Sequence, residues 1–130
     1  EWFEMRRHPD IGADIILKCG TRLERVADIV RHHHEHWDGS GYPSGLKGEE
    51  IPKGSQVIAV CDAIDSMMIE RVYRQALPPD VCKQEILDGK GTLFCPELAD
   101  VFLENWDKLV SNVYPEQTEP APINTFQECQ

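Results

Sequence analysis

The sequence of 130 residues contains no long run of apolar residues. A helix that crosses a bilayer needs about 20 consecutive, mostly apolar residues, and no segment approaches that length. The first ten residues, EWFEMRRHPD, also lack the apolar stretch of a signal peptide. We therefore expect no membrane insertion and a cytoplasmic location.

Closely spaced cysteine pairs are missing as well. The cysteines are odd in number, lie far apart and include no C-x-x-C pair. This pattern argues against a disulfide framework and against a structural zinc site built on thiolates. We expect free thiols at all five positions, Cys19, Cys61, Cys82, Cys95 and Cys129.

Positive charge is scarce, with 13 lysines and arginines against 23 acidic residues and a formal net charge of −10. Proteins that bind nucleic acid polymers present a basic face to the phosphates, so we expect no such partner. An anionic ligand would have to be small and be met by local cations. The apolar content of 41% is enough for the core of one domain.

Apolar residues recur at three- and four-residue spacing through most of the chain, which predicts an all-α fold. The expected helices cover residues 9–18, 21–36, 55–71, 79–87 and 96–109. Residues 37–53 are rich in glycine and proline and are expected to form a loop that serves a function. We expect a domain over residues 1–110 and a disordered or loosely attached tail over residues 111–130.

The first residues have no helix start signal, although Trp2, Phe3 and Met5 are at helical spacing. This pattern predicts that the chain begins inside a structural element and is a fragment of a longer protein. A naturally truncated protein is the alternative.

The segment RHHHEHWDGSGYP, residues 31–43, places four histidines and a glutamate just before the loop. Neighbouring residues of a helix project about 100° apart. His33 and His34 therefore cannot coordinate one ion symmetrically, but they can bind two adjacent ions or two edges of one metal cluster. A solvated helix end, stabilised by the helix dipole, explains the same spacing. The spacing alone leaves both interpretations open.

The longer segment HHEHWDGSGYPSGLKGEEIP, residues 33–52, resembles the signature of the HD-GYP family, bacterial phosphodiesterases of the HD metal-phosphohydrolase superfamily. HPDIGADII upstream and VIAVCDAIDSMMIERVYRQAL downstream extend the resemblance over roughly residues 2–104. It implies an incomplete helical bundle of the HD superfamily, the C-terminal part of the domain. The complete domain would hold two or three divalent transition metal ions, iron or manganese, and hydrolyse cyclic di-GMP.

The resemblance also implies roles for individual residues. Arg71 and Arg74 would contact the phosphates and guanines of the ligand, Tyr42 would lie beside it, and Glu35 and Asp38 would hold the histidine rings or fix the loop. The implied metal ligands are His8, His33, His34 and Asp62.

From the residues alone these positions have simpler interpretations. Periodicity places Asp62 opposite an apolar helix face, as a solvated residue. Two arginines at a helix end usually compensate the dipole, and a tyrosine in a turn can pack on its own loop. Only the resemblance directs Asp62 into a cleft.

The chain also departs from the family pattern. It contains no His-Asp dipeptide, the element that supplies a metal-bridging aspartate, and Val72 and Cys95 replace the proline and aspartate common in the family. We therefore expect the 130-residue chain alone to be inactive. A non-catalytic module that binds cyclic di-GMP or a protein is the alternative, and action on another nucleotide is a third. Association into a homodimer or with a partner protein is also left open.

Overall fold

The computed structural model describes residues 2–118, which form α-helices and short 3-10 turns and no β-strand. The all-α prediction is therefore confirmed. No helix within this range is long and apolar enough to cross a membrane. The helices are α1 (Trp2–Met5), α2 (His8–Lys18), α3 (Glu24–Arg31), α4 (Lys53–Met68), α5 (Pro79–Asp88), α6 (Pro96–Glu104) and α7 (Trp106–Val113).

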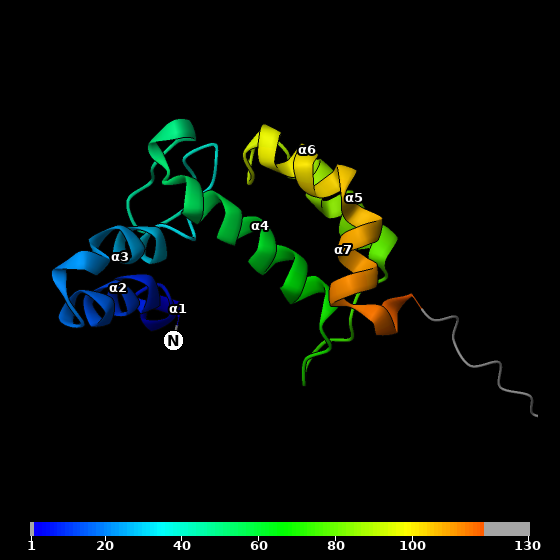
Figure 1. Cartoon of the computed structure of the whole chain (residues 1–130), viewed down its shortest axis with the longest axis horizontal. Helices are drawn as coiled ribbons and strands as arrows, with labels where there is room; N and C mark the ends of the chain where they lie inside the picture. Colours follow the sequence, from blue (N-terminus) through cyan, green and yellow to red (C-terminus); the bar gives the residue numbers. More distant parts are fainter. Residues whose placement is uncertain (1, 119–130) are drawn as a thin grey trace, which may run out of the picture.

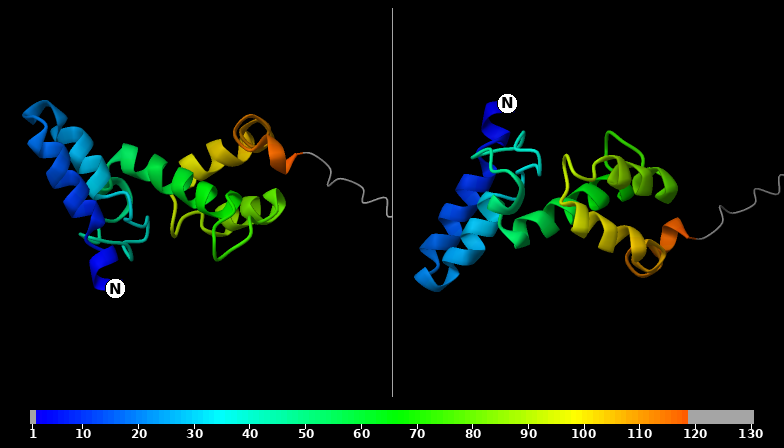
Figure 2. Two further views of the ribbon diagram at one scale, coloured as in Figure 1. Left: turned by 90° about the horizontal axis from the view of Figure 1, so that it is seen from below. Right: turned by 90° about the horizontal axis from the view of Figure 1, so that it is seen from above.

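Helix α4 connects the two halves of the molecule (Figure 1). Helices α2 and α3 pack against each other as a hairpin beside the first turns of α4, while α5, α6 and α7 gather around its second half. The two further views in Figure 2 show the same division, with α4 as the bridge. The loop between α3 and α4 lies at the junction of the two halves.

The hydrophobic core lies between α4 and the three helices that follow it. The apolar spacing of this segment predicts that Val57, Val60, Ile64 and Met67 share one helix face. Val60 and Ile64 do face the core, but Val57 is exposed, and the neighbouring Met68 is buried more deeply than Met67. The other buried members come from the second half of the chain: Cys82, Ile86, Phe94, Ala99, Trp106, Val110 and Tyr114. Helix α4 therefore turns its apolar stripe toward α5–α7, and the remainder of its surface is left for the loop and the histidines.

Three expected helices end earlier than their sequence pattern suggests, and the one expected over 55–71 ends at Met68. Helix α3 stops at Arg31 instead of continuing to residue 36, because the ring of His33 donates a hydrogen bond to the Val30 carbonyl at 2.5 Å. The helix expected over 96–109 is broken at Asn105, whose side-chain amide bonds the Val101 carbonyl at 2.8 Å. In the latter two places a polar side chain competes with the backbone for a helix carbonyl.

The folded region extends past residue 110, where the tail was expected to begin. Helix α7 continues to Val113, and Tyr114 is only 6% exposed. The Tyr114 hydroxyl donates a hydrogen bond to Oδ1 of Asp65 on α4, at 3.0 Å. Residues 119–130 lie outside the described residues, so the tail remains a prediction for them.

Replacement of Tyr114 tests whether this segment stabilises the domain. We expect Tyr114→Ala to lower the free energy of unfolding by about 3–5 kcal/mol, the usual cost of removing a buried aromatic ring. Tyr114→Phe keeps the ring and loses one hydrogen bond, so it should cost about 1 kcal/mol. Urea unfolding measures both, with Tyr73→Ala as a control because Tyr73 is 96% exposed. Equal stability of Tyr114→Ala and the parent protein would contradict the packing described above.

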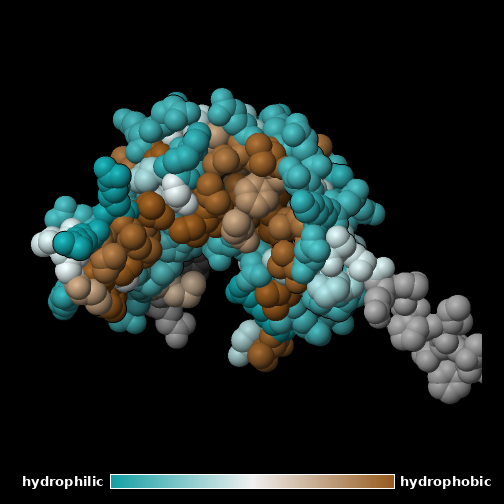
Figure 3. Space-filling model, in the orientation of Figure 1, coloured by the Kyte–Doolittle hydropathy of each residue, from teal (hydrophilic) through white to brown (hydrophobic). Residues whose placement is uncertain are grey.

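Apolar side chains also reach the surface, over α4 and its neighbours on the face shown in Figure 3. A pocket of about 420 Å³ is lined by residues of α4, α6 and α7 together with Tyr114. Phe102, Leu109 and Val113 contribute to its mostly apolar wall.

Candidate metal centre

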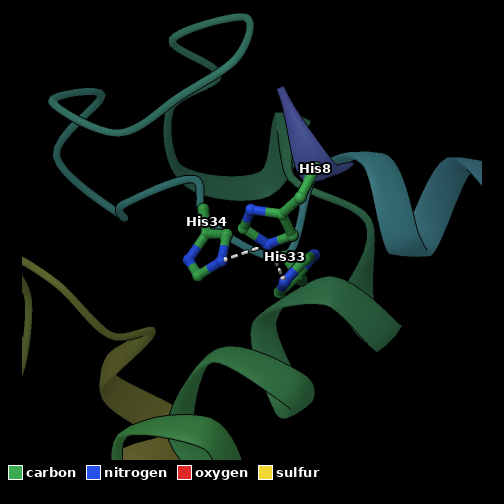
Figure 4. Close-up of side chains that lie close together, drawn as sticks. All are labelled: His8, His33 and His34. Carbon is green, nitrogen blue, oxygen red and sulfur yellow. Dashed lines mark hydrogen bonds between the residues drawn. The ribbon is translucent and has the colours of Figure 1, made fainter. Parts of the chain in front are cut away.

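Three histidines from two parts of the chain meet beside α4 (Figure 4). His8 begins α2, whereas His33 and His34 lie on the turn that follows α3. Nε2 of His8 is 3.0 Å from Nε2 of His34 and 3.5 Å from Nε2 of His33. The structure thus brings together three of the four residues expected as metal ligands.

The backbone orients two of these rings. Nδ1 of His8 donates to the Met5 carbonyl at 2.6 Å, and Nδ1 of His33 donates to the Val30 carbonyl at 2.5 Å. A histidine with its proton on Nδ1 carries a lone pair on Nε2, and such a second hydrogen bond is usual for metal-binding histidine. The early end of α3 therefore positions the His33 ring.

The cluster has the spacing and protonation that a transition metal requires. One nitrogen of each ring lies within 4.8 Å of the other two, and nitrogens about 2 Å from a shared ion are roughly 3–4 Å apart. Burial, followed by the neighbouring His33 and His8, lowers the pKa of His34 to about 4. His34 is therefore neutral near pH 7, as a metal ligand must be.

Asp62 lies near the cluster but is not one of its three members. It lies just past the middle of α4 and lines a pocket of about 180 Å³ together with His33, His34 and His36. Its carboxylate acts to raise the pKa of His34, against the larger lowering by burial. The side chain is exposed, as the periodicity predicts, and it nevertheless faces the pocket of the histidines.

The acidic residues after the histidines fix the loop. Glu35 is 2% exposed, and its two carboxylate oxygens accept hydrogen bonds from the backbone N–H groups of Ser44 at 2.7 Å and Leu46 at 3.1 Å. Asp38 accepts one from the Ser40 N–H at 2.9 Å, and hydrogen bonding by Ser40 lowers the pKa of Asp38. Of the two roles expected for Glu35 and Asp38, these contacts correspond to fixing the loop.

Tyr42 lies flat against His34. Their ring centroids are 5.1 Å apart at an interplanar angle of 18°, and the Tyr42 N–H bonds the His34 carbonyl at 3.1 Å. The loop approaches the histidine turn this closely only because residue 41 is glycine. A Cβ on Gly41 would lie 2.3 Å from the backbone nitrogen of His36 and 2.5 Å from the backbone oxygen of His34. The Tyr42–Pro43 peptide is cis.

Arg71 and Arg74 lie beyond the other end of α4 and line neither the histidine pocket nor the pocket beside Tyr42. Their backbones pair in a tight turn, with Arg71 N–H to Arg74 O at 2.8 Å and Arg74 N–H to Arg71 O at 3.0 Å. The Arg74 guanidinium donates to the Ser66 carbonyl. A ligand that reaches both the histidines and this turn would have to extend along α4.

One cation beside the cluster was not expected from the sequence. The guanidinium carbon of Arg6 lies 4.8 Å from the centroid of the Tyr42 ring, on a pocket that Phe3 and Arg7 also line. The adjacent Arg6 and Arg7, directly before His8 in a chain short of positive charge, were the signal that could have identified it.

Comparison with known proteins identifies a family and several relatives of this chain. Residues 1–98 match the family model described as HD domain. A 3'3'-cGAMP-specific phosphodiesterase 2 of Vibrio cholerae is 36% identical over 112 residues, which are 85% of this chain and 22% of that protein. A cyclic di-GMP phosphodiesterase of Thermotoga maritima is 39% identical over 116 residues, 88% of this chain and 31% of that protein.

A solved structure shares the fold. The crystal structure of a cyclic GMP-AMP specific phosphodiesterase of Vibrio cholerae matches with a TM-score of 0.61 and 30% identity, covering 78% of this chain and 22% of that one. The chain thus spans between about a fifth and a third of the length of these relatives.

Proposed function

The chain belongs to the HD domain family, and we propose that it is part of a metal-dependent phosphodiesterase that hydrolyses cyclic di-GMP. The convergence of three Nε2 atoms from His8, His33 and His34 is the observation that supports this proposal most directly. Cyclic dinucleotide phosphodiesterases among the relatives support it independently. The cytoplasmic location expected from the sequence is retained as part of the proposal.

In the proposed site the three histidines would hold a transition metal ion, iron or manganese, and Asp62, which lines the same pocket as His33 and His34, would supply a carboxylate ligand. A bound ion supplies Lewis acidity and a hydroxide nucleophile for the phosphodiester. Imidazole nitrogens with a carboxylate suit such metals. Two or three ions in the complete domain remain our expectation.

The other side chains bind and orient the substrate. Tyr42, held flat on His34, would lie beside the substrate and keep the loop against the histidine turn. Arg71 and Arg74 supply guanidinium groups for the distant end of the dinucleotide, where planar forks bind phosphate oxygens or a guanine edge. Glu35 and Asp38 keep the loop in place through their backbone hydrogen bonds.

A mixed dinucleotide, 3'3'-cGAMP, is the second candidate substrate. The relatives compared above include a phosphodiesterase specific for this molecule, and the matching crystal structure is of another. Both substrates present the same 3',5'-phosphodiester to the histidines, so the metal cluster does not discriminate between them.

Hydrolysis by the complete protein tests the proposal. Purified protein loaded with Mn²⁺ or Fe²⁺ should convert cyclic di-GMP, 3'3'-cGAMP or both into linear products that chromatography separates, and a chelator should stop the reaction. Metal-loaded protein that leaves both molecules intact would contradict the proposed function. If calorimetry then showed binding of the intact dinucleotide, the non-catalytic binding module would replace it.

A further inference from the structure

Beside the metal cluster is a second pocket that the proposed chemistry does not use. It has a volume of about 340 Å³ and is lined by Arg6 and Arg7 of the α1–α2 connection, with Phe3 before them, and by the loop residues Gly41, Tyr42 and Pro43. This volume is at the lower end of the range for ligand pockets. It suits one part of a dinucleotide better than the whole molecule.

The wall of this pocket is continuous with the metal cluster. The Arg6 guanidinium lies over one face of Tyr42, and Tyr42 stacks with His34, whose Nε2 is 3.0 Å from that of His8. A group in the pocket is therefore separated from the cluster by little more than one aromatic ring. A substrate with its phosphodiester at the histidines can place an adjoining base there.

Within residues 2–118 the two arginines have no acidic partner, and the aromatic ring of Tyr42 is the contact of Arg6. Neither Arg6 nor Arg7 forms an ion pair there, and neither side chain donates a hydrogen bond, whereas Arg31 binds both Asp10 and Asp14. Phe3 is 80% exposed at the same pocket. Donors, an aromatic face and apolar surface are thus all available to a ligand.

We propose that Arg6 binds the guanine base of a cyclic dinucleotide in this pocket and sets a preference for guanine over adenine. The inference rests on the proposed function and names a specificity residue for it. A guanidinium fork donates to both N7 and O6 of guanine, whereas adenine presents an N6 donor in place of the O6 acceptor. Stacking on Phe3 would hold either base, because every base has a π-face. The hydrogen-bonding edge is therefore what discriminates.

Kinetics of the complete protein test Arg6, with cyclic di-GMP as the substrate and cyclic di-AMP as a competitor. Arg6→Ala should lower kcat/KM for cyclic di-GMP roughly tenfold to a hundredfold, mostly through KM. The inhibition constant of cyclic di-AMP should change little, so the preference for guanine should collapse. Arg6→Lys keeps the charge but loses the planar fork, and should not restore the preference. Arg25→Ala is the matched control, since Arg25 is an exposed arginine of α3 that does not line the pocket.

Two other results would overturn the inference, and a third would refute the function on which it rests. Equal losses for cyclic di-GMP and cyclic di-AMP, rescued by Arg6→Lys, would mean that Arg6 contacts a phosphate. Unchanged kinetics in Arg6→Ala would mean that the pocket takes no part in binding. Failure of the unaltered protein to hydrolyse any cyclic dinucleotide would instead refute the proposed function, and this result is seen before any variant is made.

Discussion

Replacing His8 by alanine is expected to abolish metal binding at the cluster and hydrolysis with it. Nε2 of His8 lies 3.0 Å from Nε2 of His34 and 3.5 Å from Nε2 of His33, so His8 contacts both other rings of the cluster. Loss of an outer partner of a metal ligand already costs about 10–100-fold in affinity or activity, so loss of a ligand should exceed about 100-fold. Groups that act as a unit lose nearly all of the rate when one is removed. Metal analysis after loading with Mn²⁺, together with hydrolysis of cyclic di-GMP, measures both effects.

His32 supplies a matched control for this experiment. It is adjacent to His33 in the sequence, but its ring bonds the Asp28 carbonyl and the Ser44 hydroxyl and does not belong to the cluster. His32→Ala should therefore retain the metal. Because His8 is exposed, His8→Ala should also unfold at a similar denaturant concentration to the parent protein. A His8→Ala protein with normal metal content would show that the three nitrogens do not form the site.

The helices could be predicted from the sequence because their signals are local. Proline in the first turn marks α2, α5 and α6, and apolar spacing marks the buried stripe of α4. The ends of α3 and α6 could not be predicted, since they depend on whether His33 and Asn105 bond a carbonyl of the preceding turn. Tyr114 was assigned to the tail because its burial depends on Asp65, 49 residues earlier in the chain.

The site was predicted less completely, and for a similar reason. His8 is 25 residues before His33, so only the resemblance to a family linked them, and the spacing of His33 and His34 left a solvated helix end as an alternative. Periodicity described Asp62 correctly as exposed but could not show that the loop brings the histidines to its pocket. Arg6 was missed because its partner, Tyr42, lies in a loop whose path depends on one glycine.

Replacing that glycine, as Gly41→Ala, is expected to disrupt the metal centre without removing any ligand. Gly41 does not have a positive φ, so the obstacle is steric. An added Cβ would lie 2.3 Å from the His36 nitrogen, 2.5 Å from the His34 oxygen and 2.6 Å from the Glu35 Cα. These are backbone atoms that cannot rotate away, so the loop and the histidine turn must separate.

The expected result of Gly41→Ala is a loss of about 3 kcal/mol in unfolding free energy, the upper end of the usual cost of overpacking, and metal affinity at least about tenfold weaker. The weaker metal affinity follows because separation breaks the hydrogen bond from the Tyr42 N–H to the His34 carbonyl and the stacking of the two rings.

Gly48→Ala is the control in the same loop. Gly48 has a φ of +59° with nothing within 4 Å of an added Cβ, so alanine there should cost about 1–2 kcal/mol through backbone strain alone and leave metal affinity unchanged. Urea unfolding and Mn²⁺ titration separate the two variants, and equal metal affinities for both would show that contact of the loop with the histidine turn does not position His34.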